Sequence, residues 1–248
     1  MWGKGGEELS FAIENDWKNC SQDKEWVMLS NAWDWLRPLY AVEALQGYTE
    51  DEIKLLKGVF GALPPVLEEY YRIAGRTEEL HQVQDIWMQP EYFQAWGWLR
   101  QSEYLVLLNE NQGVCRAGIR KEDLCLPDPP VYYTEDDKNW ILCAPTTSEF
   151  LSAALAYEAA FHFVYSPEEF YWITGAELDF IKLNLTKLPF ELKNWVGGMG
   201  VLLFQNEADN MVAVMDCGDG DSNMLYGGAT EASYDKLRKV LEGIGEPM

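Results

Sequence analysis

The side chains best suited to chemistry in this sequence are carboxylates gathered in short polar segments. One segment, DCGDGDSN, places Asp219, Asp221 and Asn223 at the first, third and fifth positions of a calcium-binding loop. Such a loop needs glycine at its sixth position and a bidentate glutamate at its twelfth, where this chain has Met224 and Thr230. The segment is therefore interpreted as a polar turn between two strands, and no metal site is predicted.

A second acidic segment, Glu135-Asp136-Asp137, contains enough carboxylates for acid–base catalysis. That chemistry needs two carboxylates in different environments, held about 5–10 Å apart across a cleft. Three adjacent residues in one polar turn do not provide this arrangement. The segment is interpreted as a solvent-exposed turn that offers negative charge to a basic partner.

Histidines, cysteines and glycines add no catalytic pattern. His81 and His162 lie neither beside a nucleophile nor at zinc-ligand spacing. The five cysteines form no CxxC pair, which favours free thiols over a disulfide framework. We therefore predict no catalytic residues, no metal and no cofactor, and we expect a protein that is not an enzyme.

Aromatic residues crowd one part of the chain, where Trp87, Tyr92, Phe93, Trp96 and Trp98 lie within twelve positions. A platform that binds a sugar or a peptide is one interpretation. The interpretation favoured here is a hydrophobic core, because each ring buries a large apolar area. Any ring that stays exposed would be a natural anchor at a protein interface.

The net charge restricts the possible partners. The 248 residues include 19 Lys+Arg and 41 Asp+Glu, which gives a formal charge of −22. Such a surface repels phosphates, so neither nucleic acid nor an anionic membrane is an expected partner. The N-terminus does not resemble a secretory signal, and no apolar run is long enough to span a bilayer. We therefore expect a cytoplasmic protein with a basic protein partner.

The elements that position these segments follow from hydrophobic periodicity and capping signals. Five helices are predicted, and the fourth is expected to be strongly amphipathic. They cover residues 24–46, 50–63, 65–74, 147–164 and 230–243. Strands are predicted at residues 104–108, 114–119, 131–133, 140–143, 170–173, 180–185, 200–204, 211–215 and 225–228. Helices segregated from hairpin-linked strands indicate an α+β fold.

Three segments in order carry a family resemblance. They are a helix pair joined at a Leu-Pro corner (residues 53–75), a hairpin with an Asn-Gln-Gly turn (residues 105–119), and an edge segment with a Trp-containing strand that leads into a Ser-Glu-Phe-Leu helix (residues 128–161). Together they resemble the SUKH superfamily of bacterial immunity proteins, which includes the Smi/Knr cell-wall regulators and Syd. The resemblance covers roughly residues 50–165.

The resemblance implies helices packed on one side of a mainly antiparallel or mixed sheet. It also implies a cytoplasmic protein that binds and blocks a polymorphic or contact-delivered toxin, with no catalytic residues to transfer. We divide the chain into a helical Trp-rich leader (1–48), a SUKH-like core (49–165) and a β-rich extension with a terminal helix (166–248). The extension could continue the same sheet or form a second subdomain, and we expect one compact unit with the core.

The leading functional hypothesis is therefore a non-enzymatic immunity protein that neutralises a toxin domain. Residues chosen for charge and expected exposure form the predicted interface: Glu110, Glu135, Asp136, Asp137, Asp216, Asp219 and Asp221. A carboxylate-based hydrolase is the alternative, and it requires a deep pocket between the two halves with two facing carboxylates of raised pKa. A regulatory scaffold is a further alternative. The sequence does not predict an oligomeric state.

Overall fold

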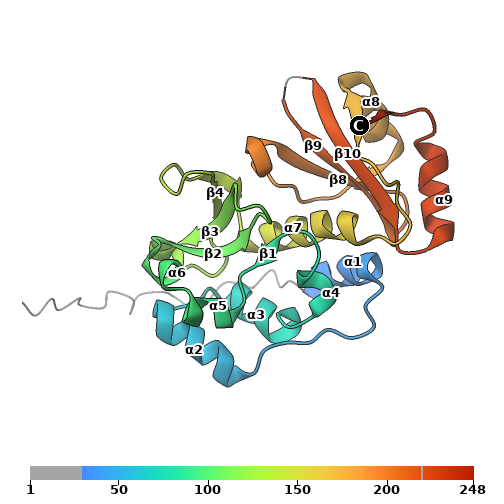
Figure 1. The fold of residues 1–248 in the computed structure, drawn as a ribbon. Helices are drawn as coiled ribbons and strands as arrows, with labels where there is room; N and C mark the ends of the chain where they lie inside the picture. The colour runs from blue at the N-terminus through green and yellow to red at the C-terminus, as the bar shows by residue number, and fades with distance from the viewer. Residues whose placement is uncertain (1–29, 219) are drawn as a thin grey trace, which may run out of the picture.

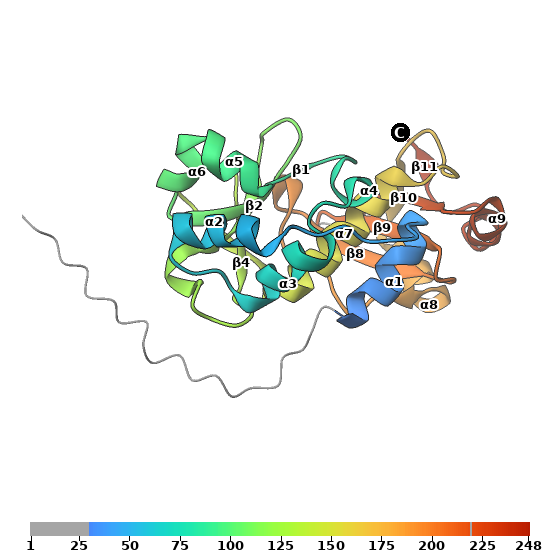
Figure 2. The ribbon, with the colours of Figure 1, turned by 90° about the horizontal axis from the view of Figure 1, so that it is seen from below.

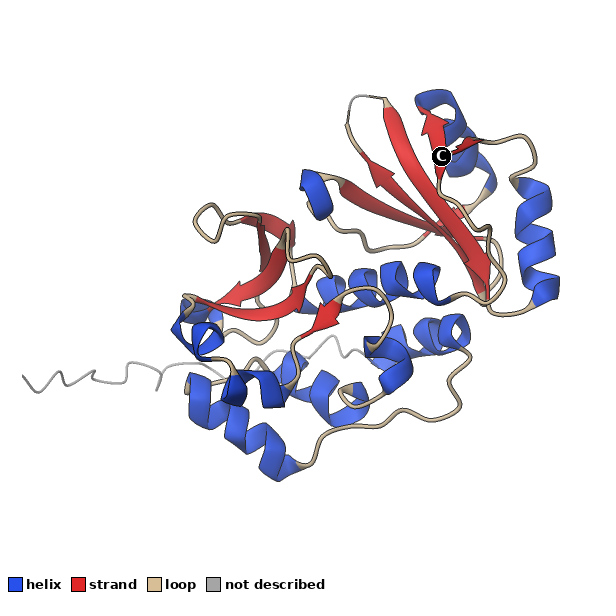
Figure 3. Ribbon diagram, in the orientation of Figure 1, coloured by secondary structure: helices blue, strands red, loops and turns tan. Residues whose placement is uncertain are grey.

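The structure of the chain is a computed structural model that describes residues 30–218 and 220–248, and it confirms the predicted α+β class (Figures 1 and 3). Its strands form two antiparallel sheets. The five-stranded sheet has the order β1-β2-β3-β4-β5, and the six-stranded sheet has the order β11-β6-β10-β9-β8-β7. The extension after residue 166 therefore forms a sheet of its own.

The strands of the five-stranded sheet are β1 (Ile86–Trp87), β2 (Tyr104–Asn109), β3 (Arg116–Arg120), β4 (Val131–Thr134) and β5 (Ile141–Ala144). Those of the six-stranded sheet are β6 (Tyr171–Thr174), β7 (Thr186–Lys187), β8 (Gly200–Gln205), β9 (Asn210–Asp216), β10 (Asp221–Gly228) and β11 (Glu246–Pro247). The helices are α1 (Ser30–Tyr40), α2 (Glu50–Phe60), α3 (Pro65–Ala74), α4 (Glu78–His81), α5 (Pro90–Ala95), α6 (Gly97–Gln101), α7 (Thr147–His162), α8 (Gly175–Asn184) and α9 (Glu231–Val240), with short 3-10 turns η2 (Lys121–Asp123) and η3 (Val196–Gly198).

The two sheets share the helix α7. This helix contacts β5 of the first sheet and β8, β9 and β10 of the second, and it also packs against α1 and α3 (Figures 1 and 2). Its residues are buried almost throughout, including all those from Phe150 to Ala160. The prediction of an amphipathic helix is therefore wrong, because a helix with neighbours on every side has no solvent-facing stripe.

The six-stranded sheet is covered on both faces. Along β9, Met211, Ala213 and Met215 belong to the main core that includes α7. The alternate residues Val212 and Val214 belong to a smaller core formed with α8 and α9. This alternation follows from the strand period of two. The sheet of the extension thus has helices on both sides, whereas the expectation of one-sided packing concerned the sheet of residues 49–165.

The end of the first helix differs from the prediction. The helix predicted over 24–46 is described only from Ser30, and it ends at Tyr40. Ala41 has a left-handed φ of 52°. Its N–H donates to Pro38 O and the N–H of Val42 donates to Arg37 O, which closes the helix. Residues 1–29 lie outside the described part of the chain.

The strand predicted over 180–185 is also wrong. Most of this segment lies in α8, which begins with a capping box at Thr174 and Glu177. The N–H of Thr174 donates to Glu177 Oε2 at 2.8 Å, and the N–H of Glu177 donates to Thr174 Oγ1 at 3.4 Å. The capping signal therefore outweighs the apolar run that follows it.

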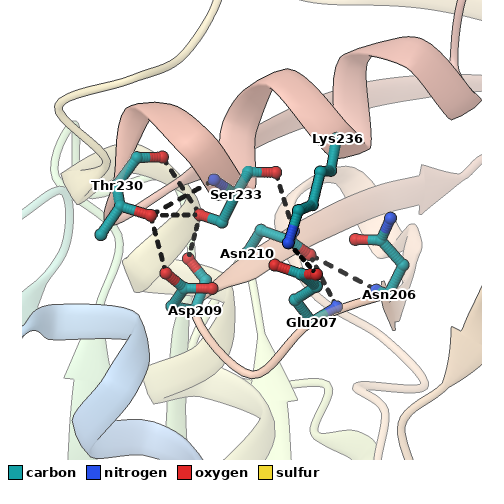
Figure 4. A network of polar contacts seen from close by, with 7 residues as sticks. All are labelled: Asn206, Glu207, Asp209, Asn210, Thr230, Ser233 and Lys236. Atoms are coloured by element: carbon teal, nitrogen blue, oxygen red, sulfur yellow. Dashed lines mark hydrogen bonds and ion pairs between the residues drawn. The ribbon is translucent and has the colours of Figure 1, made fainter.

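A polar network attaches α9 to the turn between β8 and β9 (Figure 4). Asn210 is fully buried and its Nδ2 donates to Ser233 O at 3.0 Å. Thr230, the N-cap of α9, donates from Oγ1 to Asp209 Oδ2 at 2.9 Å. Lys236 and Glu207 close the network with an ion pair of 2.6 Å. These contacts make the terminal helix part of the second sheet's packing.

None of the helices in the described residues combines the length and apolar content that crossing a bilayer requires.

Replacing Ala156, a fully buried residue of α7, by leucine tests the shared core. We expect Ala156→Leu to lower the free energy of unfolding by about 1–3 kcal/mol, because added methylenes strain a closely packed core. Urea denaturation measures this loss, and hydrogen exchange should show reduced protection in both sheets. Leu183→Ala is the control, because Leu183 is 85% exposed and its loss should change stability by less than about 0.5 kcal/mol. Unchanged protection in the six-stranded sheet would contradict the shared core.

Candidate functional site

Two predicted acidic turns are joined in space. The β4–β5 and β9–β10 loops extend to the same side of the molecule (Figure 1), and a segment around η3 connects them. Gly198 N–H donates to the Tyr133 hydroxyl at 3.1 Å, and Cys217 Sγ lies 3.5 Å from Met199 Sδ. We call the carboxylates of these two loops the acidic end: Glu135, Asp136, Asp137, Asp216 and Asp221.

The β4–β5 loop holds its carboxylates exposed. Asp136 Oδ1 accepts the backbone N–H groups of Lys138 and Asn139 at 2.9 and 2.8 Å. These bonds lower the pKa of Asp136 to about 2, because they stabilise the charged form. Glu135 accepts a hydrogen bond from Tyr133, and Asp137 pairs with Arg116 at 3.2 Å. Glu135, Asp136 and Asp137 are therefore placed as predicted, on an exposed turn.

The β9–β10 loop is a turn between two strands, as the sequence analysis interpreted it. Asp216 ends β9, and its Oδ1 accepts the Gly218 N–H at 2.8 Å. Gly218 and Gly220 have φ values of 76° and 102°, conformations that favour glycine. Asp221 is exposed and begins β10. The predicted interface residue Asp219 lies outside the described residues.

Glu110 was expected to be exposed, and this expectation is wrong. The residue is only 6% exposed. Its Oε2 accepts the backbone N–H groups of Gln112 at 2.8 Å and Val114 at 3.2 Å, so the side chain bends back under its own hairpin turn. Glu110 shapes the turn between β2 and β3 and does not belong to a partner surface.

The most unusual carboxylates of the structure were not predicted. Glu158, on α7, is fully buried, and Asp85, just before β1, is 5% exposed. Glu158 Oε2 accepts the backbone N–H groups of Gln84 at 2.9 Å and Asp85 at 3.1 Å. Asp85 Oδ1 accepts the Asn111 N–H at 3.2 Å. These bonds fasten the segment before β1 and the β2–β3 turn to the centre of the molecule.

The remaining carboxyl oxygens of this pair are buried without a donor. Asp85 Oδ2 and Glu158 Oε1 accept no hydrogen bond from the described residues, and the two carboxyls lie close enough for each to affect the pKa of the other. Burial, and then the neighbouring Asp85 charge, raises the pKa of Glu158 to about 8. Burial also raises the pKa of Asp85. At neutral pH the pair therefore retains one proton, mainly on Glu158, and carries one negative charge.

This negative charge has no cationic partner. Within the described part of the chain, no Lys, Arg or His forms an ion pair with Asp85 or Glu158. The indole of Trp195 lies close enough to lower the pKa of Asp85, although its Nε1 makes no well-formed hydrogen bond. An uncompensated buried charge is costly, and it is a feature that often marks a functional site.

A cleft of about 570 Å³ opens beside Asp85. We call it the Asp85 cleft, and its main polar and aromatic lining residues are Tyr48, Arg76, Gln82, Asp85, Glu91 and Tyr92. Glu158 does not line the cleft, so only one member of the carboxyl pair borders it. In residues 30–218 and 220–248, no three His, Cys, Asp or Glu side chains are grouped so that they could hold a metal ion.

The aromatic crowding around residue 90 divides between core and surface. Trp87 and Phe93 are buried, as the core interpretation expects. Trp96 and Trp98 are 38% and 42% exposed. Trp98 lies under the guanidinium of Arg116 at 4.9 Å, and Arg116 also pairs with Asp137 of the acidic end. One exposed ring thus stands next to the acidic end.

No family model, curated protein or solved structure matches this chain. The resemblance to the SUKH superfamily therefore stays a prediction that depends on the residues of the sequence alone.

Because the pKa of Glu158 is raised, we expect Glu158→Gln to change the stability of the fold in a pH-dependent way. A carboxyl whose pKa rises on folding makes the folded state bind more protons than the unfolded state, here between the ordinary value of 4.5 and about 8. Stability therefore falls as pH rises through that window. Glutamine keeps the acceptor and adds a donor to Asp85, so the variant should be more stable than wild type by on the order of 1–3 kcal/mol near pH 8, with a smaller difference near pH 5.

Thermal or urea unfolding at several pH values measures this difference. Glu168→Gln, a change at an exposed carboxylate, is the matched control and should leave the pH profile unaltered. A constant difference between Glu158→Gln and wild type at every pH would show that no proton is held at this pair.

Proposed function

We propose that the chain is a binding protein that neutralises a basic toxin domain, as the SUKH immunity proteins that it resembles do. The observation that carries this proposal is the acidic end. It joins exposed carboxylates from loops of two different sheets through the segment around η3. The Asp136 carboxylate is held ionised by backbone N–H groups. Fixed charges on a preformed surface suit recognition of a basic protein partner.

The proposed mechanism separates attraction from retention. The net charge of −22 and the acidic end accelerate encounter with a basic surface through long-range attraction, which salt screens. Trp98 is 42% exposed beside Arg116 and supplies an aromatic anchor next to the charges. Val114 and Ile141, which are 49% and 47% exposed, provide further apolar contact area on the first sheet. Such anchors slow dissociation more than they affect encounter.

A carboxylate-based hydrolase is the second candidate, and one observation favours it. Asp85 and Glu158 face each other with raised pKa values, and Asp85 borders a cleft. The geometry supports it less well than binding. Glu158 is fully buried and does not line the cleft, so a substrate there would not meet the two carboxyls that this chemistry requires. This candidate requires Asp85→Asn to abolish hydrolysis of a substrate that enters the Asp85 cleft.

Neutralising the acidic end tests the leading proposal. The variant Glu135→Gln/Asp136→Asn/Asp137→Asn should associate about tenfold more slowly at low salt with its cognate toxin domain, because steering is weakened. The matched control replaces three exposed carboxylates near the C-terminal end of the chain: Glu231→Gln, Glu242→Gln and Glu246→Gln. Both variants have the same net charge, so stopped-flow association rates separate the local from the global effect.

Trp98→Ala addresses the retention step in the same assay. Its dissociation rate should rise by about tenfold while its association rate changes little. Co-expression with the toxin domain provides the cellular readout, in which wild type restores growth. Association rates that do not change with ionic strength, or equal rates for the two charge variants, would contradict the proposal that the acidic end is the binding surface. A toxin domain that stays active in the presence of wild type would contradict the immunity function itself.

A further inference from the structure

We propose that the edge of the six-stranded sheet, on the side that faces α7, binds a basic amphipathic helix of a protein partner. The surface is formed by alternate residues of β6 and β11 and their flanks: Phe170, Trp172, Glu246 and Met248. We call it the β6–β11 face. The proposal goes beyond the immunity function, which assigns no role to these residues.

The strand register places these four side chains on one side of the sheet. Met248 N–H donates to Phe170 O at 2.9 Å, and Glu246 pairs with Trp172. Opposite residues of an antiparallel pair point to the same side, and so does every second residue along a strand. Through β10, Trp172 lies in the same row as Met215, which belongs to the main core. The β6–β11 face is therefore on the side of the sheet that α7 covers.

The helix α7 packs against other strands of this sheet. It contacts β8, β9 and β10, and β6 and β11 follow beyond β10 at the edge. Among the described residues, Phe170, Trp172 and Met248 belong to neither hydrophobic core. The alternate residues Tyr171 and Ile173 belong to the smaller core on the opposite side. In the described part of the chain, β6 is thus packed on one side and unpartnered on the other.

The β6–β11 face exposes apolar side chains in a fixed arrangement. Phe170 is 39% exposed, Met248 is 66% exposed and Trp172 is half-buried. The ring of Phe170 lies 6.0 Å from that of Phe161, which packs against the main core at the end of α7. Phenylalanine, tryptophan and methionine are enriched where protein surfaces meet. The face therefore offers anchors for the apolar side of a partner.

The edge of the sheet does not favour an added strand as that partner. Met248 N–H is turned inward, toward Phe170. Neighbouring residues of an antiparallel strand turn their N–H groups in alternate directions, so position 247 faces outward. Pro247 has no N–H to donate there, and β11 is only two residues long. A partner therefore contacts this face through side chains, as the apolar side of a helix does.

The charges around the face indicate a basic partner. Glu168, Glu169 and Glu246 are exposed, and none of them forms an ion pair with a described Lys or Arg. Residues 161–175 and 241–248 contain no Lys or Arg. A helix with basic residues beside its apolar side finds complementary charge here. A second copy of the chain is disfavoured, because it brings the same acidic rim and a net charge of −22.

Fluorescence anisotropy of the full chain with a labelled peptide tests the proposal. The probe is a helix of about 18 residues with leucines on one side and lysines on the other. The full chain should bind it with a micromolar dissociation constant. A copy with glutamate in place of lysine is the charge control, and it should bind about tenfold more weakly.

Phe170→Ser should weaken binding of the lysine peptide by about tenfold, because an aromatic anchor is lost. Phe180→Ser is the matched control. Phe180 is 37% exposed on α8, which packs on the opposite side of the sheet, so this variant should bind the peptide as wild type does.

Charge variants separate local from general attraction. Glu168→Gln/Glu169→Gln/Glu246→Gln should weaken binding of the lysine peptide by about threefold. The triple variant of the acidic end removes the same charge elsewhere and should retain wild-type affinity. Because the peptide assay needs no toxin domain, its outcome is independent of the immunity function.

A spin label on the peptide locates the site without any substitution in the chain. It should broaden amide signals mainly in residues 168–174 and 244–248. Equal affinity of Phe170→Ser and Phe180→Ser, equal binding of the two peptides, or broadening confined to other segments would overturn the proposal. A wild-type dimer in sedimentation that Phe170→Ser dissociates would also overturn it, because a second copy would then be the occupant.

Discussion

The burial of α7 between the two sheets is the constraint on which the rest of this structure depends. Its residues from Phe150 to Ala160 are buried without exception, and it contacts strands of both sheets as well as α1 and α3. The five alanines of this stretch allow the neighbouring backbones to approach closely. A helix without a solvent face is stable only when every surrounding element is in place, so the two halves of the chain are expected to fold cooperatively.

Glu158 is the buried carboxylate of this helix, and its placement has consequences outside the core. Its Oε2 accepts two backbone N–H groups of the segment before β1, which offsets part of the penalty of burial. Its other oxygen accepts no hydrogen bond from the described residues, and the neighbouring Asp85 charge raises the pKa of Glu158 further. The core thus fixes the segment before β1, which forms one wall of the Asp85 cleft.

The sequence predicted those features that depend on neighbouring residues. The capping box at Thr49 and Glu52, the start of α3 at the Pro pair and the hairpin of β2 and β3 are all present. The same capping logic would have identified α8, had Thr174 and Glu177 been weighed above the apolar residues that follow. Neighbouring residues did not predict how the layers are arranged. The spacing of apolar residues along α7 does not reveal how many elements pack around the helix.

The carboxyl pair of Asp85 and Glu158 could not be predicted from neighbouring residues either. Asp85 and Glu158 are 73 positions apart, and only the fold brings them together. The sequence offered one signal, a glutamate inside the apolar run of α7. The prediction that Glu110 is exposed was wrong for a local reason. Its side chain bends into its own turn, and charge alone does not predict exposure. Where burial depends on local bonds or distant segments, residue type and spacing are insufficient.

The acidic end combines both kinds of information. Each of its two turns follows from sequence, but their connection through Gly198, Met199 and Cys217 is tertiary. The resemblance to the SUKH superfamily covers residues 50–165, so it includes the β4–β5 loop and excludes the β9–β10 loop. If the chain acts as an immunity protein, one of the two loops of its acidic end is therefore built from the extension. Because α7 packs against both sheets, this surface exists only in the complete fold, and neither half of the chain could present it alone.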